Sequence, residues 1–424
     1  MSHFPLLLLQ LVAILGVSRI LAALLGRIGQ PPVIGEMIAG IMLGPIVFGA
    51  LAPTAQAFLF APASLSALNG LSEIGLVLFM FIVGAELRLP GGARRHLSAS
   101  AMVGVLSVAL PFAFGLAISP ALHGNFAPDG VAFWPFALFM AASMAITAFP
   151  ILARILKERR MTESPIGRLS LTSAALADVL AWIVLAFVVA LISSGAGWSG
   201  FAITILGSLA LAGFAFGVLR PWLGKLLARH AADGRPSTGW LAMILILVFA
   251  AAAATSALGL HAVFGAFLVG AILPRDNRLL ACLIERLEYV AVIVLMPVFF
   301  ALAGLNTTPD AFAGAGLGAL LLIMAAAVFG KILGGAAGAR MGGFGWSDAL
   351  AVGALMNARA LMELIVMKVG LDIGVIGNEI FTMLMVMAVV TTLMTTPLLI
   401  AFSGRRRAHA VIEPESQTST GNPP

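Results

Sequence analysis

The chain has few charges and a single cysteine. Of its 424 residues only 10% are Asp, Glu, Lys or Arg, whereas 61% are hydrophobic and 46 are Gly. A soluble domain needs far more surface charge, so this composition predicts a polytopic membrane protein with closely packed helices. Cys282 is alone, which excludes an intramolecular disulfide. The net charge of +6 does not indicate a nucleic-acid partner, because the basic residues lie mainly in short loops between apolar segments.

The motifs of several enzyme classes are also missing. The sequence has no Walker lysine motif, zinc-ligand spacing or nucleophile elbow, so we expect neither an ATP-driven pump nor a hydrolase, and no cofactor. We expect residues 1–402 to form the membrane domain and residues 403–424, which are basic and then rich in Ser, Thr and Pro, to be a short disordered cytoplasmic tail. No nucleotide-binding regulatory domain is expected in this chain.

Apolar segments dominate the chain and predict an all-α fold with about thirteen transmembrane helices. Most of the 24 basic residues fall on one side of these segments, which predicts an external N-terminus and a cytoplasmic C-terminus in a bacterial-type inner membrane. The segments lie at residues 5–25, 32–51, 68–87, 99–119, 132–155, 166–194, 199–220, 238–257, 261–274, 284–304, 313–338, 347–369 and 379–402.

Two stretches read alike although they are predicted to cross the membrane in opposite directions. The run from Gly35 to Pro45 is similar to residues 265–274, and Leu78-Phe79 followed by Gly84 matches Val298-Phe299 followed by Gly304. The matches predict two inverted repeats of five helices, at about 32–194 and 261–402, as in many secondary transporters. Chance alignment of glycine-rich apolar runs is the alternative.

Four polar groups lie deep inside the apolar segments. Asp178 is the sole charge in a run long enough to span a bilayer. At ~1.5 Å per residue, Asp178, Lys331, Asn357 and Arg359 lie roughly 14 to 17 Å from the cytoplasmic ends of their segments, close to the middle of a core ~30 Å thick. Burying charges there is costly, so we expect the four groups to meet in one polar centre. Desolvation favours the neutral carboxyl, so Asp178 could hold either a proton or a cation; a role only in hydrogen bonding between helices is the alternative.

Pro150 predicts a broken helix beside this centre. Its ring clashes with the carbonyl of Ile146, so the carbonyls near Thr147 lose their helical partners. Freed carbonyls and the Thr147 hydroxyl are hard oxygen ligands suited to Na⁺, whereas a simple proline kink is the alternative. The corresponding segment of the second repeat has its own polar interruption at Asn357 and Arg359, which favours ion binding.

Two further residues carry weaker expectations. Glu363 follows Arg359 by four residues, and we expect the two to pair across one helical turn and to support the interrupted segment. His261 begins the short segment 261–274, and we expect it to be a surface histidine, with a role in the pH response as the alternative.

Motifs at five places carry a family resemblance. They are residues 35–45 (GEMIAGIMLGP), 71–87 (LSEIGLVLFMFIVGAEL), 147–154 (TAFPILAR), 177–182 (ADVLAW) and 357–364 (NARALMEL). In these motifs the sequence resembles the monovalent cation:proton antiporters of the Kef and Na⁺/H⁺ exchanger type. The resemblance implies a homodimer in lipid that exchanges Na⁺ or K⁺ for H⁺, with a core domain of crossed broken helices that moves against a dimerisation domain. It also implies that Asp178 is the ion- and proton-binding carboxylate and that Lys331 is the lysine opposite it.

One position departs from the family pattern. Members usually carry an acidic residue or Asn before the key carboxylate, and this chain has Ala177. In members with two carboxylates the preceding Asp pairs with the lysine, so Lys331 lacks that partner here. Asp178 is the nearest remaining carboxylate by depth. We expect Na⁺ to bind Asp178 by displacing Lys331 or a proton, in electroneutral one-for-one exchange. The stoichiometry stays open, and K⁺/H⁺ exchange or a non-transporting membrane sensor on the same fold are alternatives.

Overall fold

The structure, a computed structural model, describes residues 3–86, 94–162, 164–193, 198–230, 237–274, 276–359 and 361–403. Within these ranges every regular element is a helix, which confirms the predicted all-α fold. In the same ranges, 11 helical stretches are long and apolar enough to cross a membrane, and the shorter apolar helices Ala262–Ile272 and Trp346–Met356 accompany them. The protein is a multi-pass membrane protein.

The helices follow one another with short connections. In chain order they are α1 (His3–Gly26), α2 (Pro32–Leu43), η1 (Pro45–Gly49), α3 (Pro53–Leu59), η2 (Pro62–Ser64), α4 (Leu65–Glu86), α5 (Arg94–Phe126), α6 (Phe133–Ala145), α7 (Phe149–Glu158), α8 (Pro165–Ser193), α9 (Trp198–Phe214), η3 (Ala215–Leu219), α10 (Arg220–His230), α11 (Thr238–Ala257), α12 (Ala262–Ile272), α13 (Asn277–Val290), η4 (Ala291–Leu295), α14 (Met296–Leu305), η5 (Pro309–Phe312), α15 (Gly316–Met341), α16 (Trp346–Met356), α17 (Leu361–Asp372) and α18 (Asn378–Ser403).

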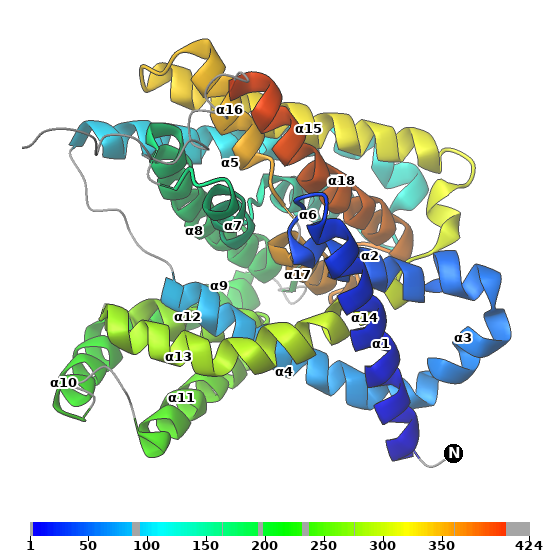
Figure 1. The fold of residues 1–424 in the computed structure, drawn as a ribbon, viewed down its shortest axis with the longest axis horizontal. Coiled ribbons are helices and arrows are strands. Elements are labelled where there is room, and N and C mark those ends of the chain that lie inside the picture. Colours follow the sequence, from blue (N-terminus) through cyan, green and yellow to red (C-terminus); the bar gives the residue numbers. More distant parts are fainter. Residues whose placement is uncertain are drawn as a thin grey trace, which may run out of the picture.

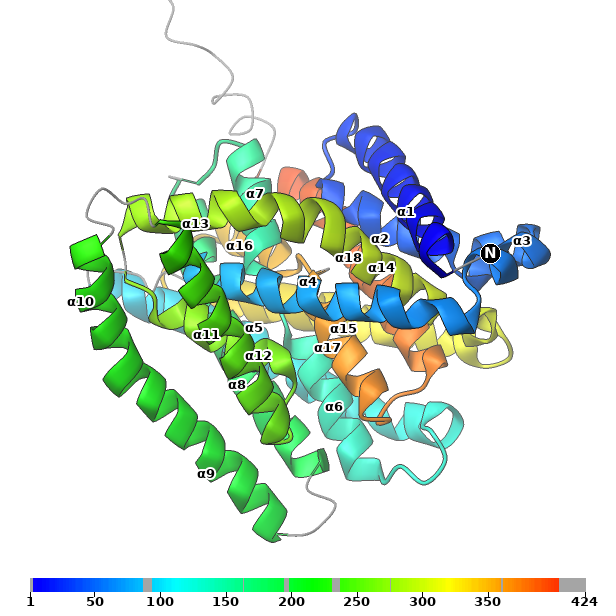
Figure 2. The ribbon, with the colours of Figure 1, turned by 90° about the horizontal axis from the view of Figure 1, so that it is seen from below.

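The helices pack in two groups (Figure 1). We call α5–α8 with α15–α18 the core bundle, in which α15 packs along α5 and against α16, and α5 also packs against α6 and α8. We call α1–α4 with α11–α14 the flanking bundle, in which α4 packs along α12 and α2 packs against α1 and α14. Between the bundles α18 packs against α2. Figure 2 shows α9 and α10 at the edge of the molecule.

Glycines let the helices of the flanking bundle touch at two places. A Cβ on Gly40 would lie 2.1 Å from the carbonyl oxygen of Phe300, and one on Gly304 would lie 1.8 Å from that of Gly40. A Cβ on Gly270 would lie 2.9 Å from the carbonyl carbon of Gly84. The proposed repeat matches Gly40 with Gly270 and Gly84 with Gly304, so it exchanges one contact for the other. This exchange supports the inverted repeat, which stays a prediction.

Three more glycines, spaced by four residues, bring α15 against α5. A Cβ on Gly330, Gly334 or Gly338 would lie 2.8, 2.4 or 2.5 Å, respectively, from an atom of the α5 backbone. Small residues at this spacing allow two helix backbones to approach closely. The approach places Lys331, which lies within the same stretch of α15, beside the backbone of α5.

Several predicted segments have the wrong bounds. The segment predicted at 199–220 continues through η3 into α10 as far as His230, and the segment predicted at 284–304 begins earlier, at Asn277. Apolar composition limits the part of a helix that lies in lipid, whereas Lys and Arg extend a helix readily beyond it. Basic residues counted as loop residues, such as Lys225 and Arg278, therefore lie on helices. The predicted tail from residue 404 onward and the loop at 87–93 lie outside the described residues.

Candidate ion-binding site

The chain leaves the helical conformation between α6 and α7. α6 ends at Ala145, Ile146 is extended with φ −70° and ψ 142°, and α7 begins at Phe149 with Pro150 in its first turn. A proline in the first turn of a helix has no helical N–H bond to lose. Pro150 is therefore compatible with the start of a second half-helix, α7. The structure thus contains the predicted break, and a simple kink in a continuous helix does not describe it.

A second break crosses the first. α16 ends at Met356 and α17 begins at Leu361, and Asn357 to Arg359 lie between them. The backbone N–H of Ala148, in the first break, donates to the carbonyl of Ala358, in the second, at 3.0 Å. The two interrupted segments therefore touch through their backbones, as expected for crossed broken helices.

Lys331 binds the first break and not Asp178. Its Nζ donates to the carbonyl of Ser107 at 2.9 Å, to the hydroxyl of Thr147 at 2.7 Å and to the carbonyl of Ala145. These three acceptors use the three N–H groups of the ammonium. Within the described residues no hydrogen bond or ion pair joins Lys331 to Asp178. Depth alone made Asp178 the nearest partner and ignored the backbone carbonyls that the broken helix exposes, and displacement of Lys331 by the cation stays a prediction.

Arg359 binds the same helix end. Its guanidinium donates to the carbonyl of Met144 at 2.9 Å and pairs with Glu363 at 2.9 Å, and both side chains are fully buried. The expected pair across one helical turn is present. Lys331 and Arg359 together supply donors to the last carbonyls of α6, which have no helical partner and carry the negative end of the helix dipole.

Asp178, on α8, faces the first residue of α7, and one of its two carboxyl oxygens has no partner. The carboxyl is 2% exposed, and the backbone N–H of Phe149 hydrogen-bonds to it. In the described part of the chain its Oδ1 is buried without a hydrogen-bond partner. The Oδ1 of Asn357 is also buried and unpartnered, whereas its Nδ2 donates to the carbonyl of Thr391 at 3.3 Å. Unused buried acceptor oxygens are costly unless something binds them, and a cation or a proton would do so.

The buried charges of the centre balance. Asp178 and Glu363 are its carboxylates, and Lys331 and Arg359 are its cations. With all four ionised the net charge is zero. A proton on Asp178 or a monovalent cation beside it raises that charge by the same amount.

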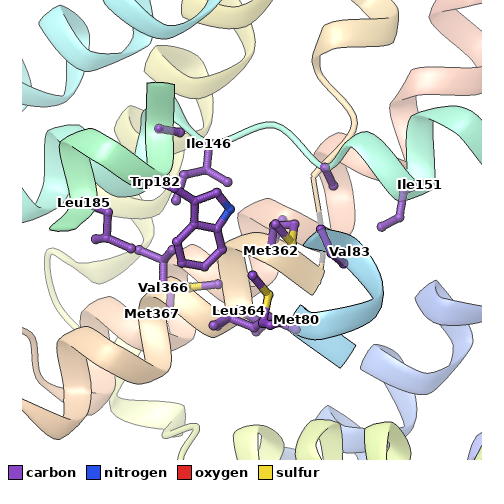
Figure 3. Packing of buried hydrophobic residues seen from close by; sticks show 14 of the residues in the cluster. Met80, Val83, Ile146, Ile151, Trp182, Leu185, Met362, Leu364, Val366 and Met367 are labelled. Carbon is purple, nitrogen blue, oxygen red and sulfur yellow. The ribbon is translucent and has the colours of Figure 1, made fainter. Parts of the chain in front are cut away.

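Apolar side chains pack around α8 one turn beyond Asp178. Trp182, one turn further along α8, packs edge-on against Phe264 and is stacked on Phe267, both of α12, with ring centroids 5.3 and 6.2 Å apart. Figure 3 shows Trp182 among buried residues of α4 and α17, including Val83 and Leu364. By the distribution of basic residues this turn lies toward the side predicted to be external.

Several partners in the site escaped the sequence reasoning. The carbonyls of Ser107, Met144 and Ala145 have no sequence signature, since any residue supplies one. The hydroxyl of Thr392 accepts from the backbone N–H of Arg359, and Thr391 contacts Asn357. The only available signal was the unusual density of Thr in the apolar segment 379–402.

Comparison with known proteins agrees with the fold and identifies the family. The transmembrane sodium/hydrogen exchanger family model matches residues 5–401. The chain is 39% identical to the Na⁺/H⁺ antiporter NhaS4 of Synechocystis, over 93% of this chain and 96% of that protein. The chain belongs to the sodium/hydrogen exchanger family. The resemblance found in the sequence is thereby confirmed.

Other relatives of this exchanger differ in their named cation and their length. It is 34% identical to K⁺/H⁺ antiporter 1 of Saccharomyces cerevisiae and 37% identical to cation/H⁺ antiporter 17 of Arabidopsis thaliana, over 94% of this chain in both cases. It spans 46% and 48%, about half, of those two proteins. The sodium/proton antiporter MjNhaP1 of Methanocaldococcus jannaschii has the same fold, with a TM-score of 0.65 at 15% identity, over 94% of this chain and 99% of that one.

Proposed function

We propose that this protein is a secondary active antiporter that exchanges a monovalent cation, Na⁺ first, for protons at Asp178. The observation that carries the proposal is the buried Asp178 carboxyl, with an unused oxygen, at the start of α7 beside the crossing of two broken helices. Membership of the family supports it. NhaS4, which aligns over nearly its whole length, is named for Na⁺, and this favours Na⁺ over K⁺.

Competition for one carboxylate couples the two ions. A proton neutralises the Asp178 carboxyl directly, and a cation bound to the same carboxylate makes the proton leave. Because both loaded forms carry the same buried charge, one cation exchanges for one proton and the cycle moves no net charge. In this scheme Lys331 keeps its hydrogen bonds to the carbonyls of Ser107 and Ala145 and to Thr147, so the ion that the cation displaces from Asp178 is the proton.

The ligands of the cation come from both breaks. We assign Asp178 Oδ1 and Thr147 Oγ1 as ligands, with Asn357 Oδ1 as an additional acceptor. The Thr147 hydroxyl accepts one bond from Lys331 and has a second lone pair for an ion. Arg359, Glu363 and Lys331 hold the backbone of the breaks in place, and Pro150 sets the start of α7. No resident cofactor takes part.

Alternating access requires the two bundles to move relative to each other. Trp182, one turn from Asp178 toward the predicted external side, packs against Phe264 and Phe267 of α12, and we propose that the next step separates α8 from α12. We propose that the flanking bundle is the part that pairs with a second copy in lipid and that the N-terminus lies outside a bacterial-type plasma membrane. The core bundle then carries Asp178 past it.

Exchange in proteoliposomes tests the proposal. After a pH gradient is set, the separate addition of Na⁺, K⁺, Li⁺ or choline is followed by the recovery of a pH-sensitive dye. Na⁺ and Li⁺ are expected to restore fluorescence, and choline is not. A response to K⁺ alone would replace Na⁺ by K⁺, and a response to none would indicate a non-transporting sensor. Reversal-potential measurements test the stoichiometry. An exchange equilibrium that depends on the membrane potential would overturn electroneutral exchange.

A further inference from the structure

Three metal-ligating side chains from distant parts of the sequence meet away from the ion-binding site. Glu73 of α4, His261 at the N-terminal end of α12 and Asp372 at the end of α17 each offer a ligand atom, and these atoms lie within 4.8 Å of one another. No short spacing in the sequence joins them, so no motif reveals the cluster. An imidazole with two carboxylates is a ligand set used by Zn²⁺ and related divalent ions.

The histidine is prepared to bind a metal. Contrary to the expectation of a surface residue, its side chain is only 14% exposed, and burial disfavours the charged imidazolium. Its Nε2 is the ring nitrogen that faces Asp372, 3.9 Å from Oδ2 of that residue. A neutral imidazole has a free lone pair, which a divalent ion can use.

The two oxygens of Asp372 have different surroundings. Oδ1 forms an ion pair with Lys368, one turn earlier on α17, and Oδ2 lies 3.9 Å from Nε2 of His261. The lysine therefore holds the carboxylate in position without occupying the oxygen that faces the histidine. A metal ion can use Oδ2 while the ion pair persists.

The cluster joins the two bundles. Glu73 and His261 belong to the flanking bundle, in which α4 and α12 pack together, whereas α17 packs against α18 and α6 of the core bundle. Asp372 lies nine residues beyond Glu363 on the same helix, roughly 14 Å at the α-helical rise. A link at Asp372 therefore restrains the helix that carries part of the polar centre.

We propose that Glu73, His261 and Asp372 form a binding site for a divalent transition-metal ion, Zn²⁺ first, which joins the two bundles and stops exchange when it is bound. Zinc ligands lie about 2.0–2.2 Å from the metal, hence about 3.3 Å from one another in a tetrahedral site. Binding therefore draws α17 toward α4 and α12 and opposes the separation of the bundles. The inhibition rests on the proposed function, whereas the binding does not.

Binding is measured by titration calorimetry on the purified full chain without an affinity tag. We expect one Zn²⁺ per chain and at least about tenfold weaker binding in Glu73→Gln and in His261→Gln, because losing a ligand should cost no less than losing a residue that only orients a ligand. His123→Gln removes a histidine whose ring contacts only the Val131 carbonyl and nearby aromatic rings, and should bind as the wild type does. Unchanged binding in both cluster variants, or equal binding of Mg²⁺, would overturn the site.

Inhibition is measured in proteoliposomes. Zn²⁺ added on the predicted external side, where the cluster lies, should slow cation-dependent proton exchange, and a chelator should restore it. The His261→Gln variant should exchange normally in the absence of Zn²⁺ and should not be inhibited by it. If Zn²⁺ binds the cluster but leaves exchange unaffected, the proposed link between the bundles is wrong. If no cation drives exchange even without Zn²⁺, the proposed function fails, and calorimetry still decides the metal site.

Discussion

The two broken helices differ in where their charged partners come from. The first break, between α6 and α7, contains no charged residue, and its charged partners come from elsewhere in the chain: Lys331 from α15, Asp178 from α8 and Arg359 from the second break. The second break contains Arg359 itself, which pairs with Glu363 four residues further along. The first break is thus organised by its neighbours, and the second is largely neutralised from within.

This difference assigns different roles to the two breaks. An internally paired segment keeps its charge balance when it moves as a unit. A segment whose charges lie on neighbouring helices can gain or lose a ligand without losing its own fold. We therefore place ion exchange at the first break, beside Asp178, and mechanical support at the second. The following substitutions test this assignment.

The largest effect is expected for Asp178→Asn. The amide keeps the shape of the carboxyl but neither ionises nor competes for a proton, so exchange should fall to background while the protein still folds. Dye recovery in proteoliposomes measures exchange, and size-exclusion chromatography measures folding. Asp129→Asn, at an exposed carboxylate, is the matched control. Substantial exchange by the Asp178 variant would remove this residue from the mechanism.

Glu363→Gln should act on stability before transport. It leaves the buried guanidinium of Arg359 without its carboxylate, and breaking a buried ion pair in this way costs about 3–5 kcal/mol. Thermal unfolding in detergent, read against Glu288→Gln at an exposed position on α13, measures the loss. A stable variant without exchange would instead make Glu363 an ion ligand and place transport at the second break.

Lys331→Gln should destabilise less and preserve exchange. The amide can still donate to two of the three acceptors, so we expect a loss of about 1–3 kcal/mol, the cost of an unsatisfied buried group. Lys225→Gln, exposed on α10, is the control for thermal unfolding. A fully stable variant that no longer exchanges would show that Lys331 itself carries the proton or is displaced by the cation.

Most of the fold and half of the site could be predicted from the sequence. Apolar length located the membrane segments, and the depths of Asp178, Asn357 and Arg359 placed them at one level. The pair of Arg359 with Glu363 followed from helical spacing. The partners of Lys331 did not, because they include the carbonyls of Ser107 and Ala145, and a backbone oxygen becomes available only where a helix ends. Residue types indicate which groups are charged and leave open which carbonyls are free.

The smallest effect, and the finest test of the first break, is expected for Thr147→Val. Valine keeps the shape and removes an acceptor of Lys331, which should cost about 0.5–1.5 kcal/mol of stability. If the same hydroxyl also binds the cation, the cation concentration for half-maximal exchange rises several-fold. Thr395→Val is matched, because that buried hydroxyl bonds only within its own helix. A stability loss without a change in cation dependence would restrict Thr147 to holding Lys331, and Asp178 would then bind the ion with Asn357 and backbone oxygens.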